Sequence, residues 1–213
     1  MIVVSVNIGT PRSMRLGSTE CATGIWKASV AEPVIVTADG LDGDTIVDQR
    51  NHGGPDQAVY LYGTADYAWW ESELGRALPP GAFGENLTIS DLESASLCAG
   101  DLVQIGETIL EVTAPRIPCA KLDVRLEEPG FAERFLSAER PGAHCRVRQG
   151  GTVQAGMNAV GTPGPEPRVS LAELMRTRAV ADVDTATLLR HLTAPISARE
   201  RERRQRELDR RSA

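Results

Sequence analysis

The chain has 213 residues, with 23 lysines and arginines against 29 acidic residues, which gives a formal charge of −6. Hydrophobic residues make up 41% and charged residues 24%, close to the average for globular proteins, and this excludes wholesale disorder. No run of 18 apolar residues occurs, and no basic segment precedes the apolar N-terminal run, so we expect neither a membrane helix nor a secretion signal. The acidic balance also argues against a protein that coats nucleic acid.

The first 160 residues predict many short strands separated by Gly, Pro and Asp. A Gly-Glu pair predicts one hairpin between residues 102–105 and 108–113, and a Gln-Gly-Gly turn predicts another between residues 145–148 and 152–154. This spacing favours a mainly β fold, a barrel or a sandwich, over alternating βαβ units. The other expected strands are residues 1–6, 33–37, 58–62 and 87–89.

Two helices interrupt these strands. Thr64 is a candidate N-cap for a helix over residues 65–74, and a second helix is expected over residues 131–138, before a proline. Trp69 and Trp70 point about 100° apart on the first helix, so we expect one in the core and the other partly exposed.

The composition changes at residues 161–168, where prolines and glycines predict a semi-rigid linker. We therefore predict a β-barrel domain over residues 1–160 and a small three-helix domain over residues 169–213. Start signals for the three helices stand at Ser170, Asp184 and Ser197.

The last predicted helix is rich in charge. Residues 199–211 hold seven arginines and four acids, a net +3, so the rest of the chain carries −9. Few apolar residues lie on this helix, so we expect it to be solvated and held by ion pairs four residues apart. A basic helix can also meet an acidic partner, but nucleic acid is not expected for so mixed a pattern.

Four cysteines, at positions 21, 98, 119 and 145, contain no C-x-x-C pair. Zinc ribbons and thioredoxin-type motifs are therefore not supported, and we expect free thiols in a reducing cytoplasm. Cys21, Cys98 and Cys145 are expected to be small buried hydrophobic side chains.

Cys119 differs from the other three. It follows an apolar strand on a loop stiffened by two prolines, and Arg116 and Lys121 lie within three residues of it. Nearby cations favour the thiolate, which is a nucleophile and a soft metal ligand. The plain alternative is a buried cysteine on a proline-kinked loop.

Three further segments contain candidate binding residues. His52 could donate to an anion or orient a glycine-rich turn, and Asn86 could cap a turn or clamp a ligand. Lys27, one of only two lysines in the chain, is a point charge suited to phosphate. No phosphate loop, dinucleotide fingerprint, G-x-S-x-G or H-E-x-x-H motif occurs. Cys119 with His52 or His144 could in principle form a hydrolytic pair.

Taken together, several motifs resemble the MOSC family, which is named for the C-terminal domain of molybdenum cofactor sulfurase. The resemblance covers about residues 1–160, and the helical tail looks like that of stand-alone bacterial members linked to resistance against N-hydroxylated bases such as 6-hydroxylaminopurine. The motifs are GLDGD (40–44), HGGPDQAV (52–59), FGENL (83–87), GD (100–101) and PRIPCAKL (115–122).

The resemblance implies a β-barrel that binds the molybdenum cofactor (molybdopterin), without pyridoxal phosphate. Cys119 would be the metal ligand, and it would share the catalytic role with His52 and Asn86. The residues implied to bind the cofactor are Lys27, His52, Asn86, Arg116, Cys119 and Arg146.

The activity implied is a cytoplasmic reductase that detoxifies small N-hydroxylated compounds, bases or their analogues, by removing the oxygen as water. The redox chemistry would belong to the cofactor, and electrons would come from a separate donor protein. A homodimer is also expected. Two alternatives remain open: a sulfur or cofactor carrier with a persulfide on Cys119, and a binding protein that docks a partner through its arginine-rich helix.

Three positions depart from the family pattern. His144 stands where an aromatic residue such as Tyr is expected, Ala28 and Ser29 follow Lys27 without a second cation, and Met157 replaces an expected Asp. The change at His144 could alter the substrate pocket, and the missing cation weakens the case for Lys27 as a cofactor anchor.

Overall fold

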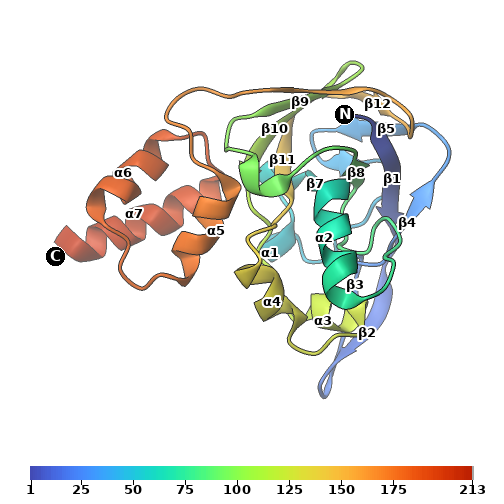
Figure 1. Cartoon of the computed structure of the whole chain (residues 1–213), viewed down its shortest axis with the longest axis horizontal. Helices are drawn as coiled ribbons and strands as arrows, with labels where there is room; N and C mark the ends of the chain where they lie inside the picture. Colours follow the sequence, from blue (N-terminus) through green and yellow to red (C-terminus); the bar gives the residue numbers. More distant parts are fainter. Residues whose placement is uncertain (213) are drawn as a thin grey trace.

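The computed structural model describes residues 1–212, which form a strongly curved β structure with three helices gathered on one side (Figure 1). The main sheet has eight strands in the order β13-β9-β10-β11-β7-β8-β1-β4, and β7–β8 is its parallel pair. A three-stranded sheet, β12-β5-β6, and a hairpin, β2-β3, complete the strands. Their bounds are β1 (Val3–Gly9), β2 (Arg12–Leu16), β3 (Thr19–Thr23), β4 (Lys27–Val30), β5 (Val34–Thr37), β6 (Gly40–Leu41), β7 (Val59–Gly63), β8 (Leu87–Ile89), β9 (Leu102–Ile105), β10 (Thr108–Ala114), β11 (Ala143–Gln149), β12 (Gly151–Val153) and β13 (Ala159–Thr162).

The main sheet curls so that β13, at one edge, approaches β1, which lies next to the strand at the other edge. Ile2 forms an antiparallel bridge with Asn158, just before β13, and Val3 N donates to Met157 O at 2.9 Å. The start of β1 thus lies beside the start of β13, and the apolar side chains of the strands meet in one buried core. The prediction of a mainly β, barrel-type fold with a C-terminal helical part is confirmed.

One of the two predicted hairpins is confirmed and the other is wrong. β9 and β10 pair as an antiparallel hairpin around Gly106, whose φ of 57° suits glycine. β11 instead pairs with β10 and β7, and β12 pairs with β5. Cys145 is fully buried in this arrangement, so β11 gains more buried surface in the main sheet than a local hairpin would give it.

Two of the helices against the barrel match the prediction in extent. Their bounds, with those of the other helices, are α1 (Gln49–His52), α2 (Thr64–Leu74), α3 (Lys121–Leu126), α4 (Phe131–Ser137), α5 (Leu171–Ala179), α6 (Thr185–Thr193) and α7 (Ala198–Ser212). Trp70 is fully buried and Trp69 is half-buried, as expected. Thr64 as N-cap is wrong, because Gly63 holds that position and the Thr64 hydroxyl accepts from Asp91 N instead. None of the helices in residues 1–212 is long and apolar enough to cross a membrane.

The start signals of the three tail helices are confirmed. In each case a side-chain oxygen accepts a hydrogen bond from the backbone N–H three residues further on, in the pairs Ser170–Glu173, Asp184–Thr187 and Ser197–Glu200.

The prediction of a solvated last helix is wrong for one of its faces, although much of the helix is exposed and the expected ion pair four residues apart occurs between Glu200 and Arg204. Arg204 is fully buried and Glu200 is only 2% exposed. Arg204 donates to Leu174 O at 3.1 Å and to the Thr177 hydroxyl at 2.7 Å, so α7 buries a charged face against α5. The long arginine stem fills the space that an apolar stripe would otherwise occupy.

The tail is joined closely to the barrel. Val169 and Ile196 belong to the same core cluster as the strands, and β13 continues to Thr162, two residues into the predicted linker. Gly164 N donates to Asp101 at 2.8 Å, which holds the linker against the barrel. That residues 1–160 and 169–213 are separate domains, joined by a linker at residues 161–168, stays a prediction.

Candidate functional site

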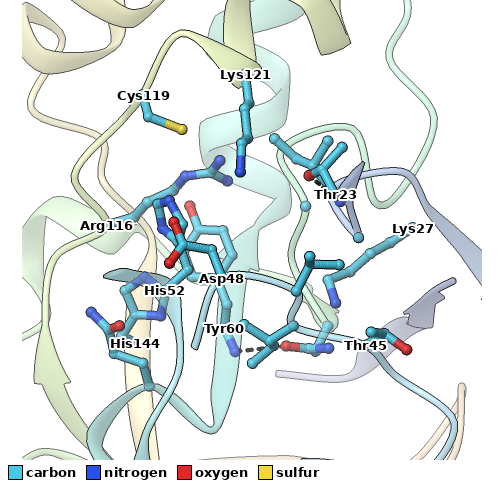
Figure 2. Close-up of a pocket in the computed structure, with 17 residues that line it drawn as sticks. Thr23, Lys27, Thr45, Asp48, His52, Tyr60, Arg116, Cys119, Lys121 and His144 are labelled. Atoms are coloured by element: carbon cyan, nitrogen blue, oxygen red, sulfur yellow. Dashed lines mark hydrogen bonds between the residues drawn. The ribbon is translucent and has the colours of Figure 1, made fainter. Parts of the chain in front are cut away.

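Two cavities meet at the loop between β10 and α3. The small cavity has a volume of about 100 Å³ (Figure 2), and the large cavity has a volume of about 640 Å³. The large cavity lies within the volume range of drug-sized ligand sites, and the small one opens beside it. The residues that line both cavities, and therefore mark their boundary, are Asp48, His52, Gln57, Cys119, Lys121 and His144.

The Cys119 thiol is presented by a short, stiff loop. β10 ends at Ala114 because the prolines that follow have no N–H for the sheet, and Leu122 N donates to Cys119 O at 2.8 Å where α3 begins. The side chain is half-buried, and Figure 2 shows it on the same side of the small cavity as Lys121. Lys121 has no hydrogen bond or ion pair with another described residue. The local geometry therefore places a thiol beside a free cation.

Arg116 is a buried cation without an acidic partner. Its residue is only 9% exposed, and its guanidinium lies 5.3 Å from the centre of the Tyr60 ring. No carboxylate of the described residues lies within ion-pair distance of it. Gly84, which lines the same cavity, has a φ of +73°, a backbone conformation that favours glycine. A buried cation of this kind is costly without a partner, so an anion bound at this wall would be stabilised.

Lys27 also lines the small cavity, but its charge is already paired. Its ammonium is bound by both oxygens of Asp44, and the two side chains are 7% and 4% exposed. Burial lowers the pKa of Lys27, while Asp44 opposes that shift. Asp44 also accepts from Gly9 N at 2.8 Å. Lys27 is therefore anchored within the protein, with less free charge to offer a ligand than Arg116.

Asn86 completes this network. Its amide nitrogen donates to Asp44 at 2.9 Å, and its carbonyl oxygen accepts from Tyr60 N at 3.0 Å. Next to it, the fully buried Glu85 accepts from Tyr67, Gly81 N and Thr88, which fixes the loop before β8. Because both ends of the Asn86 amide are engaged, the structure favours a positioning role for it over direct contact with a substrate.

Two histidines lie at the boundary of the cavities. Burial, and then the charge of Arg116, lower the pKa of His52 below its usual value. The same two causes lower the pKa of His144 to about 3, and its ring lies 4.9 Å from that of Tyr60. His144 Nδ1 is buried without a hydrogen-bond partner. Both imidazoles are therefore neutral at pH 7, with one donor and one acceptor nitrogen each.

The loop of residues 52–57 also anchors the C-terminal helix. Ala198 N, at the start of α7, donates to the Asp56 carboxylate at 2.7 Å. Arg199 donates to Gln57 Oε1 at 2.6 Å and to Asn51 O at 2.9 Å. These contacts bring α7 to the large cavity, which its arginines line together with Cys119.

Five of the six residues that the sequence predicts for the cofactor line the small cavity: Lys27, His52, Asn86, Arg116 and Cys119. The sixth, Arg146, does not line either cavity. It lies half-buried on β11, where it pairs with Asp56 at 2.9 Å and lies 3.9 Å from Glu111. The individual roles of these residues stay predictions.

Sequence reasoning missed two groups of residues here. Asp44 lies in the GLDGD motif, which was a usable signal, but its pairing with Lys27 was not visible. Nothing local in the sequence placed Arg178 or the arginines of α7 near Cys119, because they line the same cavity only through the packing of the tail.

Fold and site together define a β-barrel protein with a cation-flanked thiol at the boundary of two cavities. The sequence profile described as MOSC domain matches residues 48–159. The chain is 36% identical over 159 residues to Uncharacterized protein YflK of Bacillus subtilis, which covers 73% of this chain and 71% of that protein. This chain belongs to the MOSC domain family.

Two further comparisons extend to the helical tail. The chain is 29% identical over 204 residues to a protein named Reductase from Gibberella moniliformis, covering 92% of this chain but only 35% of that protein. The crystal structure of YiiM from Geobacillus stearothermophilus superposes with a TM-score of 0.81 at 27% identity, covering 97% of this chain and 98% of that one. The barrel and the three helices thus occur together in a solved structure.

Proposed function

We propose that this protein is a molybdenum-cofactor-dependent reductase that detoxifies N-hydroxylated compounds, bases or their analogues. The observation that carries the proposal is the half-buried Cys119 thiol, which faces the same small cavity as the unpaired, buried guanidinium of Arg116. Membership of the MOSC family and the likeness to a protein named Reductase support it.

The residues present fit an anionic cofactor that holds a soft metal. Cys119 supplies one thiolate, which suits molybdenum with its other ligands provided by the cofactor. Arg116 and Lys121 supply positive charge that no carboxylate of the described residues neutralises. Lys27 would hold the cofactor's phosphate less strongly than they do, because Asp44 already binds its ammonium.

When bound, the cofactor would supply the two electrons that, with two protons, convert an N–OH group into N–H and water. Cys119 would hold the metal at the boundary of the two cavities, and Arg116 would hold the anionic part of the cofactor in the small one. The neutral imidazole of His52, which lines both cavities, would pass a proton toward the substrate from the solvent side. A separate donor protein would return the electrons, and we place the reaction in the cytoplasm. A homodimer stays a prediction.

The test compares the wild-type protein with two variants, Cys119→Ala and Cys21→Ala. Cys21 is the control, because it is half-buried on β3 and lines neither cavity. All three proteins are purified from a host that makes the cofactor, and bound molybdenum and reduction of 6-hydroxylaminopurine with a chemical electron donor are measured. We expect Cys119→Ala to retain less than a tenth of the wild-type molybdenum and activity, because the thiolate is the metal's protein ligand. Cys21→Ala should retain both.

A wild-type protein without molybdenum, from a host whose other molybdoenzymes are loaded, would overturn the proposal. Cyanide-releasable sulfur on Cys119 in such a protein would instead support the carrier hypothesis.

A further inference from the structure

The large cavity has a marked excess of positive charge. Six cations line it against three carboxylates, those of Asp48, Glu200 and Glu202. The cations come from four places in the chain, namely α1, α3, α5 and α7, and they are Arg50, Lys121, Arg178, Arg199, Arg203 and Arg206.

Most of this charge is not neutralised within the protein. Glu200 is already shared by two arginines: Arg178 binds its Oε1, and the buried Arg204 lies 3.7 Å from its Oε2. Arg199 binds only neutral groups, two backbone carbonyls and a side-chain amide. The side chain of Arg206 has no hydrogen bond or ion pair with another described residue. The cavity is therefore prepared for an anion.

Arg203 adds a second observation. One of its terminal nitrogens, Nη1, is buried and has no hydrogen-bond partner among the described residues, and it lies 4.0 Å from Glu200. The rest of the side chain is half-buried and lines the cavity, where an acceptor with several oxygens can reach it. Phosphate has this chemistry and matches the planar fork of arginine.

The position of the cavity indicates what the anion is part of. The large cavity meets the small one at Cys119, so a molecule in it would place one end at the thiol and the other against α7. Its volume of about 640 Å³ lies in the range of drug-sized ligand sites, which accommodates a nucleotide.

We propose that the large cavity binds the phosphate of an N-hydroxylated nucleoside monophosphate, with Arg203 and Arg206 holding the phosphate and the base directed toward Cys119. This inference rests on the proposed function, since it names the class of substrate for that site. A nucleic-acid polymer fits less well, because the cations line a cavity and the chain outside residues 199–211 carries −9.

The first test measures binding by calorimetry on the full-length protein as purified, with AMP and adenosine as ligands. We expect AMP to bind at least tenfold more tightly than adenosine. Arg206→Glu should reduce AMP affinity about five- to tenfold, since it removes one cation and adds a repulsive charge. Arg210→Glu is the matched control, because Arg210 is exposed on the same helix and does not line the cavity; its AMP affinity should equal that of wild type.

The second test uses the molybdenum-loaded enzyme with 6-hydroxylaminopurine as base, nucleoside and nucleoside 5′-monophosphate. We expect the highest kcat/KM for the monophosphate, and Arg206→Glu should lower the monophosphate-to-base ratio about five- to tenfold. Equal use of base and monophosphate, with molybdenum and reduction intact, would overturn this inference and leave the proposed function standing.

The two proposals fail in different ways. Loss of molybdenum and of all reduction in wild type would overturn the proposed function, while the AMP measurement would still decide the phosphate site. If AMP does not bind but a single-stranded oligonucleotide does, in an Arg206-dependent way, the mononucleotide site is wrong.

Discussion

The two cavities that meet at Cys119 use positive charge in opposite ways. In the small cavity, built from the barrel, Lys27 is buried and paired with Asp44, and Arg116 is buried and unpaired. In the large cavity, closed by the tail, Arg206 and Arg50 are exposed to solvent. Buried charges are costly to leave without a partner, whereas exposed charges are screened by water and salt.

This difference suits the small cavity to a ligand that stays bound and the large cavity to a ligand that exchanges. A buried, unpaired guanidinium such as Arg116 favours an anion that stays bound, because releasing it would leave the charge desolvated. Exposed arginines attract an anion without such a penalty when it leaves. The contrast suits a resident cofactor on one side of Cys119 and a substrate that turns over on the other, and each prediction below tests it.

The largest expected effect is at Asp44. Asp44→Asn keeps the shape of the side chain but removes the partner of the buried Lys27 ammonium, so we expect a loss of about 3–5 kcal/mol in the free energy of unfolding. Urea denaturation measures it. The double variant Lys27→Met/Asp44→Asn removes the stranded charge as well and should recover more than half of the loss. A double variant as unstable as the single one would show that the buried pair is not the cause.

We expect Arg116→Met to change the stability of the protein and its retention of the cofactor in opposite directions. Because no carboxylate of the described residues pairs with Arg116, its removal from the cofactor-free protein should raise the melting temperature slightly. The same change should reduce bound molybdenum at least tenfold in protein purified from a cofactor-competent host, since the anion loses its buried partner. Thermal melting and metal analysis on the same two proteins test both halves. A lower melting temperature together with wild-type molybdenum would contradict the anion-binding wall.

A pH effect should follow from His144. The unfolded imidazole has a pKa of 6.5 and the folded one about 3, so the unfolded chain takes up protons first as pH falls. Stability is therefore complete above about pH 6.5 and is lost progressively toward pH 3. Between pH 7.5 and pH 5, His144→Phe should lose about 1–2 kcal/mol less than wild type, because its ring cannot titrate. Equal losses in the two proteins would show that the environment of His144 is not the cause. Because the pKa of His52 is also lowered, the stability of both proteins should still fall somewhat as the pH falls.

Local signals predicted much of the fold. The hairpin of β9 and β10 depends on a two-residue turn, and the starts of α5, α6 and α7 depend on caps within three residues, so sequence alone identifies them. The partners of β11 and β12 depend on strands far along the chain, and the local turn gave the wrong pairing. The hairpin of β2 and β3 was missed because its polar strands bury little surface.

The same distinction applies to the site. The motif residues Lys27, Asn86 and Cys119 were recognisable one by one, and the fold brings them to one cavity. What the motifs could not show is which charges are paired. The large cavity was also invisible in the sequence, because Asp56 holds the start of α7 across 142 residues.

The smallest expected effect is at Arg206. Since this side chain is exposed and has no ion pair with another described residue, Arg206→Ala should change the free energy of unfolding by less than about 0.5 kcal/mol, at low salt and at 0.5 M NaCl alike. Urea denaturation beside Arg210→Ala, an exposed arginine of the same helix outside the cavity, checks it. AMP binding by the wild-type protein should nevertheless weaken at the higher salt, because the phosphate contact is screened there. A stability loss above about 1 kcal/mol would mean that Arg206 supports the fold as Asp44 does. Its charge would then be structural, like the buried pair of Lys27 and Asp44, and the contrast between the two cavities would not hold.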